Sequence, residues 1–462
     1  MSRAHRPAAV VPVEPRSPVG RYLRLGLALG RHLDGLVDAY YGPAELAAEA
    51  TDGPPRPLGS LGAEAQALLD DLDGLAPLDL PPEGTSRLAA EAALVGVDAG
   101  HRVAPQTAAP AADPVADEVA DEVADEVARR RWLRAQVVGL SVTARRLAGE
   151  EVAYADEVEW CYGVRPRRVP EEVLAAAHRR LDDVLPGSGP LRDRLVAWRE
   201  AHTVPPDLLR PAISSLVEDL RQRTRERFGL PEGEAVEFEL VTGQPWAGFN
   251  YYLGGLRSRV AVNVDLPVLS TSIAHLVAHE AYPGHHTEHT RKEVGLVRDR
   301  HRAEETIFLV GTPQCLVAEG LADLALEVVC GPRPEPVVAE HLHPLGIRYD
   351  TEVVASVAVA SEALGAVRQN AAFRLHEDGA DPETVVGEVA RWGLLPRDRA
   401  EKAVAFLTHP TWRAYLTCYV EGYRLCRRFV AGDPVRFDRL LSEQLTPADL
   451  DAGAPTEQPP RS

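Results

Sequence analysis

The run His279-Glu280-Ala281-Tyr282-Pro283-Gly284-His285-His286 constrains the fold more than any other part of the chain. Pro283 cannot donate a backbone hydrogen bond and its ring clashes with the carbonyl four residues earlier, while Gly284 tolerates almost any backbone conformation. A helix that enters this run therefore has to kink or bulge at the Pro-Gly pair. Histidines are also concentrated here, because five of the 15 in the chain fall within one short stretch, at His275, His279, His285, His286 and His289.

The run is a modified form of the signature H-E-x-x-H, in which two histidines one helical turn apart hold a zinc ion. Residue 283, four after His279, is proline, so the strict signature is absent. Residues seven apart are separated by roughly 10.5 Å along a straight helix, which is too far for two ligands of one ion. A distortion at the proline, of which a π-bulge is one form, would bring His285, or less readily His286, back to His279. The alternative is an exposed helix with unrelated histidines that ends at a Pro-Gly turn.

A third ligand is needed, because a catalytic zinc usually keeps three protein side chains. Apolar residues at helical spacing in 269–278 predict that His279 lies at the inner end of a buried helix. Glu319, in the apolar segment 316–327, is the best candidate for the third ligand, and Gly320 beside it permits another helix to approach closely. Asp323, one turn further, would orient a ligating histidine. Without the upstream run, Glu319 would be interpreted as an ordinary helix carboxylate.

Segments 235–241 and 260–264 show the alternation of β-strands and are joined by a Gly-rich connection. A small sheet is therefore predicted just before the metal-binding helix. An edge strand beside a metal can pair with the backbone of an extended substrate.

HEAYPGHH, the segment AEGLAD at 318–323 and Tyr419-Val-Glu-Gly-Tyr423 together resemble the HExxPGHH domain-of-unknown-function family of metallopeptidase-like proteins. That family is related to the gluzincin oligopeptidases and carboxypeptidases. The resemblance runs from about Tyr22 to about Asp438 and implies a mainly α, two-lobed fold with one small β-sheet preceding the zinc helix. The chain departs from the family pattern at Leu321 and His289, which affects pocket shape and substrate preference.

The resemblance also implies roles for individual residues. It implies that His279 and one of His285 and His286 bind Zn²⁺ together with Glu319. Glu280 would be the general base that takes a proton from the metal's water.

The same resemblance implies that Tyr419 stabilises the oxyanion that forms when water attacks the peptide carbonyl. For Tyr415 and Tyr423, on the same predicted helix face, core packing is preferred. Asn263 and Arg374 are weaker candidates for substrate binding, since an arginine can clamp a substrate carboxylate.

These observations predict zinc-dependent hydrolysis of peptide bonds in short peptides. The alternatives are a catalytically inactive metal-binding or structural protein on the same scaffold, or a zinc amidohydrolase of non-peptide substrates. Zinc, cobalt and manganese are not distinguished by the sequence, nor are the cleavage mode and the oligomeric state.

The charge and composition of the chain exclude some classes of binding partner. The net charge of −19 argues against nucleic acid or an anionic membrane as a partner, because both require a basic surface. No signal-like segment and no apolar run of about 18 residues is present, which predicts a cytoplasmic enzyme. The five scattered cysteines predict reduced thiols.

The predicted organisation is a disordered tail at 1–18, a helical region at 19–232, a catalytic region at 233–445 and a second disordered tail at 446–462. An acidic low-complexity insertion is predicted at about 103–128, where valines and acids repeat every four residues. Helical periodicity covers 21–50, 130–147, 170–184, 191–200, 207–228, 303–310, 313–329, 350–375, 382–392, 397–407 and 411–430.

Overall fold

The computed structural model describes residues 12–74, 114–244 and 246–455. The fold is mainly helical with small β-sheets, so the predicted mainly α class is confirmed. The prediction of one sheet is wrong, because a strand near the N-terminus pairs with one inside the segment 303–310 that was predicted to be helical. No helix in the described ranges is long and apolar enough to cross a membrane.

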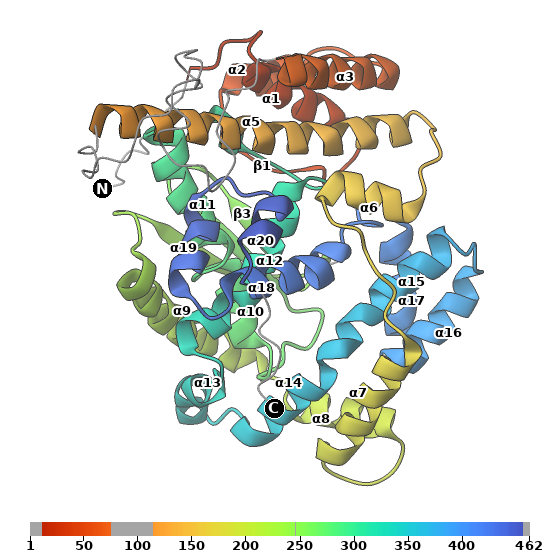
Figure 1. Ribbon diagram of the computed structural model, residues 1–462. Coiled ribbons are helices and arrows are strands. Elements are labelled where there is room, and N and C mark those ends of the chain that lie inside the picture. Colours follow the sequence, from red (N-terminus) through yellow and green to blue (C-terminus); the bar gives the residue numbers. More distant parts are fainter. Residues whose placement is uncertain (1–11, 75–113, 245, 456–462) are drawn as a thin grey trace, which may run out of the picture.

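The N-terminal helices form a layer at the top of the molecule (Figure 1), with the long α5 running beneath the others. They are α1 (Pro18–Gly30), α2 (Ala44–Thr51), α3 (Leu58–Gly74) and α5 (Pro114–Leu147). Ser17 caps α1 by accepting a hydrogen bond of 3.1 Å from the backbone N–H of Gly20. The predicted single helix at 21–50 is wrong, since the strand β1 (Val37–Tyr40) interrupts it.

The acidic repeat forms the first part of α5 and is therefore helical. A four-residue period drifts only slowly around a helix, so like residues stay on one side. Asp125 lies 3.2 Å from Arg300, and Arg129 lies 2.6 Å from the buried Glu304, so this part of α5 is tied to the body of the protein. The remainder of the predicted insertion, 103–113, lies outside the described residues.

The two sheets are small. In the first, β1 pairs antiparallel with β5 (Ile307–Leu309), and a bulge lies between Val37 and Ala39. In the second, the order is β2-β4-β3, with β2 (Ala235–Val241) parallel and β3 (Gly248–Tyr252) antiparallel to the central β4 (Arg257–Asn263). The predicted strand at 235–241 is confirmed, whereas β3 was not predicted. β2 and β3 are therefore the edges of this sheet.

The remaining α-helices are α6 (Tyr154–Tyr162), α7 (Glu171–Val184), α8 (Leu191–Ala201), α9 (Pro206–Phe228), α10 (Ile273–Glu280), α11 (His285–Lys292), α12 (Pro313–Cys330), α13 (Glu335–Leu342), α14 (Thr351–Ser361), α15 (Ala366–His376), α16 (Pro382–Trp392), α17 (Arg397–Thr408), α18 (Tyr423–Val430), α19 (Pro434–Ser442) and α20 (Pro447–Gly453). Among them, α7, α8, α9, α12, α16 and α17 follow predicted segments, whereas α6, α13 and α19 were not predicted and the predicted helix at 350–375 is divided in two. Short helical turns add η1 (Glu293–Arg298), η2 (Ala303–Thr306), η3 (His343–Leu345), η4 (Glu362–Gly365) and η5 (Cys418–Gly422).

Helix α12 lies in the interior and packs against α10, α18 and η5. A Cβ on Gly320 would collide with the backbone of Gly422, so glycine is required where these two segments cross. The prediction that Gly320 permits close helix approach is confirmed. This crossing fixes the position of Glu319, the residue before it.

The hydrophobic clusters do not follow the predicted boundary at 232/233. One cluster joins Leu216 and Leu220 of α9 to Val277 of α10 and Val357 of α14. The predicted tail at 446–462 is wrong for 447–453, which form α20 with Thr446 as its N-cap. Residues 456–462 and 1–11 lie outside the described residues.

Candidate metal centre

The helix that enters the Pro-Gly run is interrupted there. α10 ends at Glu280 and α11 begins at His285, with a cis peptide bond between Tyr282 and Pro283. A Cβ on Gly284 would collide with the carbonyl group of His279, so only glycine lets the chain turn back this closely. The predicted distortion is present, but it takes the form of two separate helices and not of a bulge. Its consequence is that His285 returns to His279.

Three side chains from α10, α11 and α12 converge on one point. His279 Nε2 lies 3.2 Å from His285 Nε2 and 3.4 Å from Glu319 Oε2, and His285 Nε2 lies 3.6 Å from Glu319 Oε1. The three ligand atoms of His279, His285 and Glu319 all lie within 4.8 Å of one another. Atoms bound to one tetrahedral ion at about 2.0–2.2 Å have separations of this size.

The environment of Glu319 also fits a cation. Its side chain is only 7% exposed, and Oε2 has no hydrogen-bond partner among the described residues. A buried carboxylate oxygen without a donor is costly unless a cation lies beside it. The residues present therefore suit a divalent metal ion.

The two candidate histidines differ in their electrostatics. Burial lowers the pKa of His285 to about 4, with Glu319 opposing this shift and His279 adding to it. The imidazole of His285 is therefore neutral at pH 7, which is the form that binds metals. Burial also disfavours the charged form of His279, but the hydrogen bond to Asp323 and the nearby carboxylate of Glu319 outweigh it and raise its pKa well above the usual value.

Asp323 holds the far side of His279. Its Oδ1 lies 3.0 Å from His279 Nδ1 and 3.4 Å from His275 Nε2. A carboxylate on Nδ1 fixes the ring so that Nε2 points toward Glu319 and His285. His275 is a further member of this cluster that was not among the predicted site residues.

We expect Asp323→Asn to weaken the binding of a divalent metal ion by about 10- to 100-fold, because an amide orients the His279 ring less firmly than a carboxylate. Competition with a chromogenic chelator measures this affinity. An unchanged affinity would show that Asp323 does not support the metal ligand.

Glu280 lies at the end of α10 against β3. Asn250 of β3 donates a hydrogen bond of 2.5 Å to its backbone carbonyl, and a Cβ on Gly248 would lie 3.1 Å from its Oε1. Burial raises the pKa of Glu280 to about 7, with His279 opposing the shift and Glu319 and Asp323 adding to it. A carboxyl group with a pKa near 7 is well matched to proton transfer at neutral pH.

Asp38 was missed by the sequence analysis. It occupies the bulge in β1, and bulges commonly redirect a side chain next to a functional site. Burial raises its pKa to about 7, and the charges of Glu319 and Glu280 add to this shift. No sequence pattern pointed to Asp38, because residue 38 falls inside a segment predicted to be helical.

The tyrosines follow a different arrangement from the predicted helix face, since the π-helical turn η5 breaks the segment 411–430. The Tyr415 hydroxyl donates a hydrogen bond of 2.8 Å to Glu319 Oε1, so the preference for core packing of Tyr415 missed this contact. Tyr419 is 37% exposed, and its hydroxyl lies 2.9 Å from that of Tyr415. The Tyr419 ring stacks against His279 at a centroid distance of 6.4 Å.

Three residues that were predicted to belong to the site do not join the cluster of His279, His285 and Glu319. His286 is fully buried and contacts Ser258 at 2.8 Å and Glu234 at 3.0 Å, so it faces away from His279. Asn263 is buried and donates to the backbone carbonyls of residues 244 and 246, which makes it a structural residue of the sheet. Arg374 binds Glu388 and Asp378 in exposed ion pairs.

His286 belongs to a buried network around Glu234, whose side chain has no exposed surface. Glu234 accepts hydrogen bonds from Tyr282 at 2.6 Å and from Arg221 Nε at 2.7 Å. Burial disfavours the ionised form, but the hydrogen bonds from His286, Tyr282 and Arg221 outweigh it and lower the pKa of Glu234 to about 2. This network fixes the segment between α10 and α11 to the sheet.

We expect Glu234→Gln to lower the free energy of unfolding at pH 7 by about 2–3 kcal/mol, because the amide cannot replace the carboxylate between Arg221 and His286. A depressed pKa stabilises the fold above the unfolded-state pKa of about 4.5, and this contribution is lost as the pH falls toward 2. The deficit of the variant in urea unfolding should therefore shrink between pH 5 and about pH 2. A deficit independent of pH would contradict this account.

Comparison with known proteins supports the fold. No family model matches the chain, and no curated protein matches it. A solved structure titled "putative lipoprotein" from Colwellia psychrerythraea has a TM-score of 0.56 and 12% identity, covering 94% of this chain and 97% of that one. A second, a "putative lipoprotein of unknown function" from Shewanella oneidensis, has a TM-score of 0.41 and 12% identity, covering 94% and 82%. At this identity the first similarity establishes a shared fold and no function.

Proposed function

We propose that this protein is a zinc-dependent hydrolase of peptide bonds in short peptides. The observation that carries the proposal is the convergence of His279, His285 and Glu319 from three helices, with Glu280 next to the first of them. Structural zinc sites usually have four protein ligands, whereas catalytic sites have three and leave a position for water. The three-residue set is therefore typical of a catalytic site.

Zinc at this site would act as a Lewis acid and lower the pKa of its water. Glu280 would accept the proton of the attacking water and deliver it to the leaving amine, a transfer suited to its pKa of about 7. The edge strand β3, which pairs only with β4 among the described strands, lies beside Glu280 and could pair with an extended peptide backbone.

Tyr419 would donate a hydrogen bond to the oxyanion. Tyr415 has a single hydroxyl hydrogen and donates it to Glu319, so Tyr419 must be the donor in the Tyr415–Tyr419 pair. Tyr419 therefore has to leave Tyr415 before it can donate to a substrate. Its exposure of 37% leaves room for such a movement.

Two measurements on the purified protein test the proposal. Elemental analysis after dialysis against zinc should give one ion per chain. The same dialysis and analysis are repeated with cobalt and with manganese. Incubation with a mixed library of short peptides, read by mass spectrometry, should show cleavage and its mode. Stoichiometric zinc without cleavage would favour an inactive scaffold, and cleavage of simple amides alone would favour an amidohydrolase of non-peptide substrates.

The cytoplasmic location stays a prediction. The lipoprotein description of the structural neighbours raises the alternative of a membrane-attached protein outside the cytoplasm. Cell fractionation of the natural host separates the two.

A further inference from the structure

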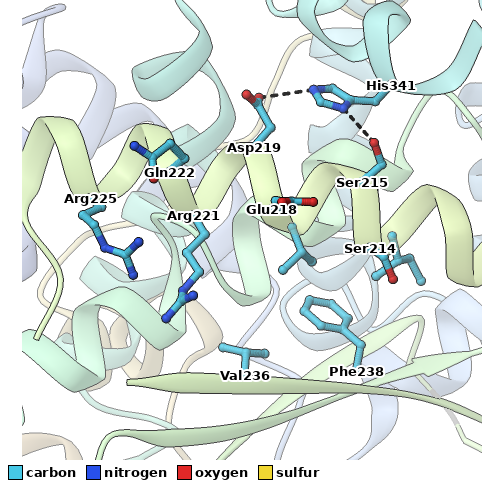
Figure 2. Close-up of a pocket in the computed structure, with 12 residues that line it drawn as sticks. Ser214, Ser215, Glu218, Asp219, Arg221, Gln222, Arg225, Val236, Phe238 and His341 are labelled. Atoms are coloured by element: carbon cyan, nitrogen blue, oxygen red, sulfur yellow. Dashed lines mark hydrogen bonds and ion pairs between the residues drawn. The ribbon is translucent and has the colours of Figure 1, made fainter. Parts of the chain in front are cut away.

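A groove of about 830 Å³ lies between helix α9 and the edge strand β2, away from the metal-ligand candidates. Its floor is apolar, with Val236 and Phe238 on β2 facing Ile213 and Val217 on α9. Figure 2 shows Arg221 pointing from α9 toward Val236, with Glu218 further along the helix. We call this space the α9–β2 groove.

One wall of the groove is held by a polar cluster that is already satisfied. Ser215 Oγ lies 2.9 Å from His341 Nδ1, and His341 Nε2 lies 3.3 Å from Asp219, so α13 is fastened to α9 (Figure 2). Asp219 is also bound at 2.6 Å by Arg223. The charge of Asp219 is therefore neutralised within the protein.

The two arginines that line the groove differ in how fully their charges are neutralised within the protein. Arg221 lies 2.5 Å from the buried Glu234 and is committed to it. Arg225 reaches Glu234 only at 3.5 Å, and its side chain is 46% exposed. Arg225 therefore has donors to spare for a ligand carboxylate.

Glu218 supplies an available negative charge in the groove, as Arg225 supplies an available positive one. It is exposed, lines the groove, and has no ion pair or hydrogen bond to the side chain of any described residue. Glu218 and Arg225 are seven residues apart on α9, which places them roughly 10.5 Å apart along the helix axis. The groove thus presents one available negative charge and one available positive charge at a fixed spacing, with apolar surface below.

A short peptide with free ends matches this pattern. Three extended residues span about 10–11 Å between an ammonium group and a carboxylate. Side chains of such a peptide can rest on Val236 and Phe238. Strand β2 pairs only with β4 among the described strands and is therefore an edge strand of its sheet.

We propose that the α9–β2 groove binds a free peptide of about three residues, with its carboxylate at Arg225 and its ammonium group at Glu218. This is a binding site separate from the metal centre, and no hydrolysis is required of it. Arg221 and its partner Glu234 connect the groove to Tyr282, inside the segment between α10 and α11, and to His286, in the first turn of α11.

The test is calorimetric titration of Ala-Leu-Ala into the Glu280→Gln variant, which preserves shape and removes the proposed general base, so the probe is not consumed. N-acetyl-Ala-Leu-Ala-amide is the matched probe without end charges. We expect saturable binding of the free peptide and binding weaker by about fivefold or more for the blocked one.

Matched variants locate the site. Arg225→Gln and Glu218→Gln are each made in the Glu280→Gln background. Each should lower the affinity for the free peptide by about fivefold and leave the affinity for the blocked peptide unchanged. Arg227→Gln is the control, because Arg227 is an exposed arginine of the same helix that does not line the groove. It should change neither affinity.

Absence of saturable binding overturns the inference, as does binding that Arg225→Gln and Glu218→Gln leave unchanged, since such a peptide would occupy another site. Because the readout is binding to a variant without the general base, failure here is independent of whether the wild-type protein cleaves peptides. Conversely, groove binding can be found in a protein that proves inactive.

Discussion

Replacing Glu280 with glutamine is expected to leave the metal bound and to lower the rate of peptide hydrolysis by about 10²- to 10⁴-fold. The amide keeps the shape of the side chain but cannot accept a proton from water. Glu280 is not one of the three converging ligands, so the metal content should match that of the wild type. Elemental analysis and initial rates on the best library peptide measure the two quantities.

Glu327→Gln provides the control for this experiment. Glu327 lies on α12, two turns beyond Glu319, and forms no ion pair or side-chain hydrogen bond to the described residues. Its replacement should change neither rate nor metal content. A Glu280→Gln protein that retains the wild-type rate would show that the general base has been assigned wrongly.

Replacing His285 with glutamine is expected to weaken zinc binding by about a hundredfold or more, since loss of a ligand should cost at least as much as loss of its support. His286→Gln is the informative comparison, because the two histidines are adjacent and only His285 faces His279. His286→Gln should destabilise the fold through the loss of its contact with Glu234 while leaving the zinc stoichiometry intact below the melting temperature.

Chelator competition and thermal unfolding of both variants distinguish these effects. Loss of zinc from the His286 variant, with retention by the His285 variant, would reverse the ligand assignment and with it the proposed centre.

Local patterns were sufficient for much of the fold. The apolar spacing of 313–329 and 382–392 predicts helices found at nearly the same residues, because amphipathic periodicity is a property of the local sequence. Where short elements depend on distant partners, the pattern was misleading. β1 is a strand because residues 307–309 pair with it, and that pairing is invisible from either segment alone.

The candidate site also has features that the local sequence predicts and features that depend on distant segments. The sequence by itself singled out His279, Glu280 and Glu319 as candidates, since histidines and acids within apolar helices require partners. It also required a distortion at Pro283 and Gly284, because neither residue continues a helix normally.

Tertiary structure decided the rest. Which of His285 and His286 returns to His279 depends on four residues of irregular backbone and on Glu234, which holds His286 on the other side. Asp38, Tyr415 and the α9–β2 groove are likewise products of segments that meet only in the folded chain. Sequence spacing specifies which side of a regular element a residue faces, but the direction of a side chain after an interrupted helix is set by the contacts that the whole fold provides.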